Sequence, residues 1–111
     1  MNELEFAKSV GRMIQECHSL AKSNGFWDEE PNVGEKIALM HSELSECLES
    51  LRKGDREDDH LPQFQNSVVE LADVIIRIFD FAGYYNLPLA EAILAKHAFN
   101  KSRPFRHGKN F

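Results

Sequence analysis

The chain has 111 residues, enough for one hydrophobic core and for a single domain. Its composition is that of a soluble globular protein, and no apolar run approaches the roughly 18 residues that a membrane span needs. The net charge of −5 hides an asymmetry, because five of the 13 Lys and Arg residues follow residue 95, where no acid occurs. The acidic body argues against general nucleic-acid binding, and the acidic, amphipathic N-terminus lacks the form of a signal peptide.

Apolar residues recur at helical spacing through the first half of the chain. They predict one helix over about 3–23, which Gly25 can end, and a second from near residue 32 or 34 to about residue 52. Between them lies a loop, FWDEEPNV, that holds the only tryptophan. Cys17 and Cys47 fall at apolar helix positions, so we expect buried free thiols in a reducing, cytoplasmic compartment.

The stretch 66–82, NSVVELADVIIRIFDFA, is the most apolar part of the chain. Its larger polar residues follow one another at steps of three and four, which places them in one stripe on a predicted helix. Such a helix belongs inside a bundle, where buried carboxylates need a partner or a metal ion. The plainer alternative is that the stripe is the one solvated face of a core helix.

Pro88 suits the first turn of a fourth helix, which reaches about Lys101. Four helices without a strand predict an all-α fold, a small helical bundle forming one domain over residues 1–111, with a basic tail over residues 102–111. Because the third helix is apolar around most of its circumference, we expect a second copy to complete the core, in a homodimer or homotetramer.

Two predicted helices each carry a pair of carboxylates three residues apart, Glu43 with Glu46 and Glu70 with Asp73. If these helices are antiparallel neighbours, the four carboxylates converge and repel one another unless a divalent cation lies among them. Oxygen ligands without Cys or His select Mg²⁺ or Mn²⁺. A di-iron bundle needs Glu-x-x-His on core helices, whereas the only such pattern here lies in the charged connection, at residues 57–60.

Lys96, Asn100 and Arg103 form a basic and polar set on the fourth helix and just after it. Lys supplies a point charge and Arg a bidentate fork for phosphate oxygens, so this set is typical of a polyphosphate site. The alternative is a solvated basic helix end that complements the helix dipole.

Taken in order, these three motifs resemble the MazG-like, all-α nucleoside triphosphate pyrophosphohydrolases, over roughly residues 34–109. The resemblance implies Mg²⁺-dependent hydrolysis, with Mn²⁺ as a possible substitute, of a (deoxy)nucleoside triphosphate to the monophosphate and pyrophosphate, as nucleotide-pool house-cleaning. It also implies roles for individual residues. The metal ligands would be Glu43, Glu46, Glu70 and Asp73, the catalytic base Glu46, and the phosphate-binding residues Lys96, Asn100 and Arg103.

The chain departs from this pattern at one position. Many members carry Glu immediately before the first motif Glu, where this chain has Ser42, so the identity of the base and the number of metal ions stay open. Trp27 could stack on the nucleobase or form a hydrophobic lid over the bundle end. We interpret Arg77 as a structural partner of Asp80 or Asp73.

Two other functions remain open on sequence grounds. The first is a non-catalytic helical module that binds nucleotides or a protein partner. The second is a nucleic-acid binder that uses the basic tail, which would lose affinity steeply with salt. Neither the preferred base nor the choice between dimer and tetramer follows from the sequence.

Overall fold

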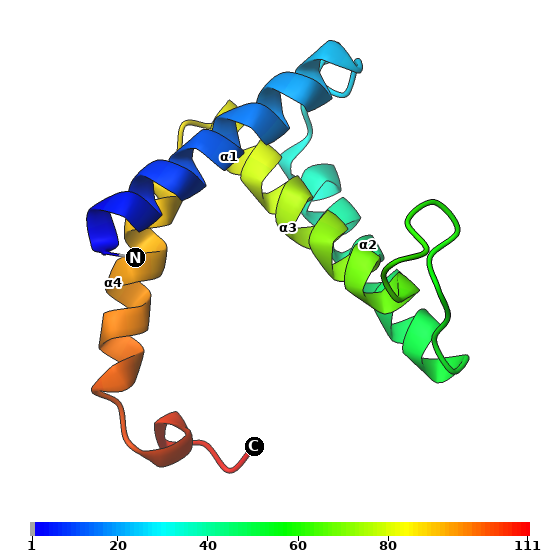
Figure 1. Ribbon diagram of the computed structural model, residues 1–111. Helices are drawn as coiled ribbons and strands as arrows, with labels where there is room; N and C mark the ends of the chain where they lie inside the picture. Colours follow the sequence, from blue (N-terminus) through cyan, green and yellow to red (C-terminus); the bar gives the residue numbers. More distant parts are fainter. Residues whose placement is uncertain (1) are drawn as a thin grey trace.

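A computed structural model describes residues 2–111 of the chain. These residues form four α-helices and no strand, which confirms the predicted all-α class (Figure 1). The helices are α1 (Glu3–Ser23), α2 (Val33–Arg52), α3 (Asn66–Tyr84) and α4 (Leu89–Lys101), and a 3₁₀ turn follows at Phe105–Gly108. An isolated antiparallel bridge joins Glu57 and Gln65 between α2 and α3. No helix in this part of the chain is both long enough and apolar enough to cross a membrane.

Side-chain caps explain where the first two helices begin. The Asn2 side-chain oxygen accepts a hydrogen bond from the Glu5 amide at 2.8 Å, and Asn32 does the same for Glu35 at 3.0 Å. Each cap satisfies a backbone N–H that has no partner within its helix. The residue before α3, Gln65, makes no such bond, so α3 depends on tertiary contacts for its start.

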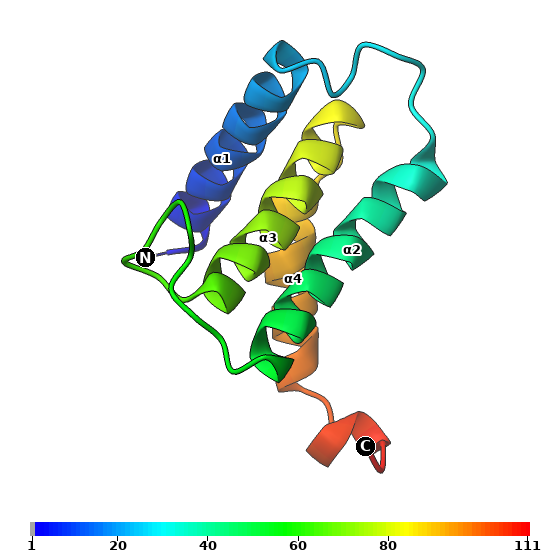
Figure 2. The ribbon, with the colours of Figure 1, turned by 90° about the vertical axis from the view of Figure 1, so that its right-hand side faces the viewer.

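The helices pack unevenly. α3 packs against both α2 and α1, whereas α4 packs against α1. Figures 1 and 2 show α2 and α3 side by side and antiparallel, with α1 crossing α3 near the end of α3 and α4 running away from α2. A single chain therefore builds a helical layer with α4 to one side, and the predicted four-helix bundle is not confirmed.

Gly83 allows the crossing of α1 and α3. A Cβ atom at this position would lie 2.7 Å from the Cβ of His18 and 3.2 Å from the carbonyl oxygen of Ile14. Both distances are shorter than an ordinary contact, so only glycine permits this approach without displacement of α1.

The core of the single chain is small. Among residues 2–111, the buried apolar side chains are Ile14, Cys17, Cys47, Val74, Ala82 and Ala90. The two cysteines are free, as predicted. Large apolar residues of α2 and α3 remain exposed, including Leu44 at 46 %, Leu51 at 57 % and Ile75 at 51 %. The apolar stripes that the sequence predicts as core are therefore only partly covered.

The accessible surface and the radius of gyration are both larger than those of a compact monomer of this mass. The accessible surface is 8519 Å², whereas a compact monomer of 12.7 kDa exposes about 6200 Å². The radius of gyration is 16.3 Å, against about 13 Å for a compact domain of this length. One chain thus leaves roughly 2300 Å² more surface in water than its mass requires.

Candidate metal centre

The connection between α2 and α3 is organised by two of its acidic residues. Asp55 accepts hydrogen bonds from the Ser50 hydroxyl at 2.9 Å, from the Ser67 hydroxyl, and from the Ser67 amide at 3.1 Å. The Ser67 hydroxyl contributes most to holding the pKa of Asp55 below its ordinary value. These bonds tie the first turn of α3 to the last turn of α2 and supply the cap that Gln65 does not.

Asp58 organises the same loop from the other side. Its carboxylate accepts from the backbone amides of His60 and Leu61, each at 3.0 Å, and from the Asn66 side chain at 2.8 Å. The Asn66 amide contributes most to the lowered pKa of Asp58. The sequence identified this segment only as a charged connection, yet its hydrogen bonds set the register in which α2 meets α3.

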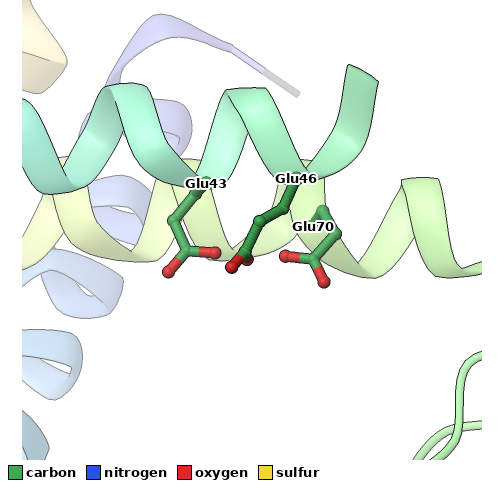
Figure 3. A group of neighbouring side chains, drawn as sticks. All are labelled: Glu43, Glu46 and Glu70. Carbon is green, nitrogen blue, oxygen red and sulfur yellow. The ribbon is translucent and has the colours of Figure 1, made fainter. Parts of the chain in front are cut away.

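In this register three of the four predicted metal ligands come together. Glu43 and Glu46 on α2 and Glu70 on α3 each offer a carboxylate oxygen, and these atoms lie within 4.8 Å of one another. Figure 3 shows the three carboxylates projecting to the same side of the helix pair. Glu43 is buried, Glu70 is half-buried and Glu46 is exposed, so the group is open to solvent on one side.

The fourth predicted ligand, Asp73, lies one turn further along α3 and outside this group. It lines an adjacent cavity together with Glu43. Burial raises the pKa of Asp73, and the charge of Glu43 raises it further. Its role as a ligand stays a prediction.

Arg77 is the cation that contacts the acidic group. Its Nε–H donates to Glu43 Oε1 at 2.8 Å. Burial acts to raise the pKa of Glu43, but the Arg77 hydrogen bond and charge, with bonds from Glu46 and Glu70, hold it below its ordinary value. The interpretation of Arg77 as a partner of Asp80 or Asp73 was wrong, because Arg77 pairs with Glu43 on α2. Spacing along α3 carries no information about a partner on another helix.

The pKa of Glu70 is shifted in the opposite direction from that of Glu43. Burial, followed by the neighbouring carboxyl groups of Glu46 and Glu43, raises the pKa of Glu70 to about 7. Its Oε2 atom is buried and has no hydrogen-bond partner among residues 2–111. A carboxylate in this position is stabilised either by a proton or by a cation. The group contains oxygen donors only, without Cys or His, which suits Mg²⁺ or Mn²⁺.

A partly apolar cavity of about 280 Å³ begins at Glu43 and extends along α3 away from Glu70. Phe26, Met40, Ile76 and Phe81 line its apolar part, and Asp80 lies in its wall. On the other side of the acidic group the surface is polar. The carboxylates therefore lie between a partly apolar cavity and a more polar hollow.

Trp27 belongs to the wall of this cavity, but its ring faces are covered. One face of the Trp27 ring stacks on Tyr84, with ring centres 3.9 Å apart. The Lys36 Nζ atom lies 4.1 Å from the centre of the Trp27 ring, and because Tyr84 occupies the first face, Lys36 must lie over the second. The indole N–H donates to Asp80 Oδ1 at 2.8 Å. Stacking of a nucleobase on Trp27 stays a prediction and requires Lys36 to move, whereas the alternative role as a lid matches these contacts.

The predicted phosphate-binding residues are not part of this site within one chain. Lys96, Asn100 and Arg103 belong to α4 and the residue after its C-cap, and none of them lines the cavity or the acidic group. The Lys96 Nζ and Arg103 Cζ atoms lie 4.7 and 5.4 Å from the centre of the Phe99 ring. The Asn100 side-chain oxygen is buried without a hydrogen-bond partner among the described residues.

Sequence reasoning missed His18 entirely. Its Nδ1 atom lies 2.9 Å from Asp80 Oδ1, the same oxygen that accepts from Trp27. His18 and Asp80 are 62 residues apart, so no local pattern connects them.

Comparisons of the chain with protein families, with curated proteins and with solved structures found no match.

Proposed function

We propose that this protein is a Mg²⁺-dependent nucleoside triphosphate pyrophosphohydrolase. The observation that carries the proposal is the convergence of Glu43, Glu46 and Glu70 from two helices to within 4.8 Å, with an unpartnered buried oxygen on Glu70. Three carboxylates at this separation are costly without a cation, and Arg77 neutralises only one of them. The pattern of motifs that resembles MazG-like enzymes supports the same activity.

The donor set fits a hard divalent cation, which Glu43, Glu46 and Glu70 would hold, with Asp73 as a further candidate ligand. A bound Mg²⁺ would supply electrostatic stabilisation of the charge that develops on the phosphate oxygens. The group is open to solvent at Glu46, and a triphosphate and a water molecule would bind on this side.

Glu46 is the best placed of the three to act as general base. It is the exposed member of the group, so its carboxylate can accept a proton from water, while Glu43 is engaged by Arg77. Attack of that water on the α-phosphorus breaks the bond to the bridging oxygen, and pyrophosphate leaves. Arg77 keeps N–H donors beyond the one that binds Glu43, and these can contact phosphate oxygens.

The proposal includes a homo-oligomer. The excess surface of roughly 2300 Å² per chain is of the size that permanent interfaces bury, and exposed apolar side chains of α2 and α3 contribute to it. The five cations from Lys96 onward and the acidic body carry opposite charge, which favours contact between them across chains. In such an assembly Lys96, Asn100 and Arg103 would serve the acidic group of a neighbour.

The decisive experiment measures pyrophosphate release from a panel of canonical and damaged (deoxy)nucleoside triphosphates, with and without Mg²⁺. Mg²⁺-dependent release from one or a few of them would support the proposal and identify the substrate. Silence across the panel in a folded sample would contradict it.

The second candidate is a non-catalytic helical module that binds a nucleotide or a protein. The separation of the α4 cations from the acidic group within one chain favours it. This candidate predicts no pyrophosphate release even where millimolar Mg²⁺ raises the melting temperature through the carboxylate group.

A further inference from the structure

The cavity beside the acidic group contains a carboxylate, Asp80, that the proposed hydrolysis does not use. Asp80 lies on α3, seven residues after Asp73 and ten after Glu70, on the same helix face. At 1.5 Å per residue this places it about 15 Å from Glu70 along the helix axis. A nucleotide, with its phosphates at one end and its base at the other, spans a separation of this kind.

Asp80 is held in place by two groups from outside α3. His18 Nδ1 lies 2.9 Å and Trp27 Nε1 2.8 Å from the same atom, Oδ1. The Asp80 side chain is only 16 % exposed. No donor among residues 2–111 bonds to Oδ2. The arrangement therefore fixes the carboxylate through one oxygen and leaves the other available in the cavity wall.

The rest of the cavity suits a flat, largely apolar ring. Phe26, Met40, Ile76 and Phe81 line its apolar part, and its volume of about 280 Å³ is near the lower end for small-molecule sites. Two cations also lie in its wall, but Lys36 already donates to the Phe26 carbonyl and Arg77 to Glu43. A nearly buried carboxylate in such surroundings rejects an acceptor oxygen strongly and accepts an N–H donor, because an ionised carboxylate can only accept.

We propose that Asp80 selects the nucleobase, and that it selects an amino-bearing base such as cytosine over its oxo counterpart uracil. The proposal rests on the proposed function in taking a nucleotide as the ligand. The exocyclic amino group of cytosine donates to Oδ2, whereas uracil places a carbonyl oxygen at the same position. Trp27 and His18 act as positioning residues for Asp80, because both contact its Oδ1 atom and so fix the direction of the carboxylate.

Binding of CMP and UMP to the full-length protein without metal tests this selection apart from hydrolysis. Trp27 is the only tryptophan and bonds to Asp80, so its fluorescence reports occupancy. We expect CMP to bind at least about tenfold more tightly than UMP, the discrimination typical of one buried polar group left unpaired. Equal affinity, or no binding of either nucleotide at millimolar concentration, would overturn the proposal.

Asp80→Asn assigns the selection to this side chain. Its amide can donate as well as accept, so we expect the preference to fall to within about threefold, chiefly through tighter binding of UMP. Asp28→Asn removes the same charge from an exposed loop residue outside the cavity and should keep the wild-type preference. A preference that persists in Asp80→Asn would overturn the assignment.

A ligand variant keeps the test independent of how Asp80→Asn folds. The 2-pyrimidinone nucleotide lacks the amino group of CMP and has no oxo group in its place, and we expect the wild-type protein to bind it about tenfold more weakly than CMP. Binding as tight as that of CMP would overturn the proposal. Selective binding of CMP without pyrophosphate release from any triphosphate would support base selection by Asp80 and contradict the proposed hydrolysis. Pyrophosphate release that does not distinguish cytosine from uracil nucleotides would support the hydrolysis and contradict base selection by Asp80.

Discussion

The α2–α3 pair and the α4 segment are both regular helices, but they differ in how their polar side chains are used. On α2 and α3 three carboxylates meet across the helix pair, one of them, Glu43, is held by Arg77, and the group lies beside a cavity. On α4 the cations Lys96 and Arg103 lie over Phe99 of their own segment. The comparison teaches that a motif becomes a site only where another helix brings it a partner. Within residues 2–111 the acidic group has such a partner on another helix, whereas Lys96 and Arg103 contact only Phe99 of their own segment in the cation–π pairs observed.

Removing the proposed base tests the acidic half of this comparison and has the largest expected effect. Glu46→Gln should lower the rate of pyrophosphate release at least about 100-fold, because general-base catalysis contributes on the order of 10²- to 10⁴-fold. Glu35→Gln, in the exposed first turn of the same helix, should stay within about twofold of the wild type. Full activity in Glu46→Gln would remove Glu46 from the mechanism.

Mixing two inactive variants tests whether the basic residues after position 95 of one chain complete the site formed by the carboxylate group of a neighbouring chain. Glu46→Gln and Arg103→Ala subunits, refolded together in equal amounts, should recover about a quarter of wild-type activity if the assembly is a dimer with sites shared between chains. Half of the dimers are then mixed, and each contains one intact site. Mixtures as inactive as either variant alone would show that Arg103 serves its own chain or none.

Helix α1 connects the α2–α3 pair to α4, because it packs against both α3 and α4, and it crosses α3 at Gly83. Gly83→Ala should lower the free energy of unfolding by about 1–3 kcal/mol, because the new Cβ meets His18 and the Ile14 carbonyl. Gly11→Ala is the matched control, since a Cβ there meets nothing within 4 Å, and it should stabilise the protein by about 0.5–1 kcal/mol. Urea unfolding of both variants measures the difference, and equal effects would contradict the close crossing.

The smallest expected effect concerns the protonation of Glu70. Its pKa is about 7 in the folded state against an ordinary value of 4.5, so the folded state holds this proton more tightly than the unfolded state does. The resulting stability is fully present below pH 4.5 and is lost as the pH rises through 7. The melting temperature of the metal-free protein should therefore fall across this range by a few degrees more than that of Glu70→Gln.

Mg²⁺ extends this measurement. Above pH 7 it should raise the melting temperature of the wild type and have little effect on Glu70→Gln, because the variant has lost a ligand. Glu29→Gln, in the exposed α1–α2 loop, should behave as the wild type. An identical pH profile in Glu70→Gln and the wild type would contradict the raised pKa.

Spacing along the chain determined a good deal of this protein. Helical periodicity and the turn signals at Gly25 and Pro88 predicted four helices close to their observed limits. These are local interactions, so one segment is enough to read them. The two carboxylate pairs also followed from spacing, because residues three apart on a helix share a face.

Tertiary structure decided which of those side chains meet. Asp55 and Asp58 set the register that brings Glu70 to Glu43 and Glu46, while Asp73 remains one turn away. The pairings of Arg77 with Glu43 and of His18 with Asp80 join residues 34 and 62 positions apart. Contacts over such separations depend on how whole helices pack, and side-chain spacing within one helix carries no information about them.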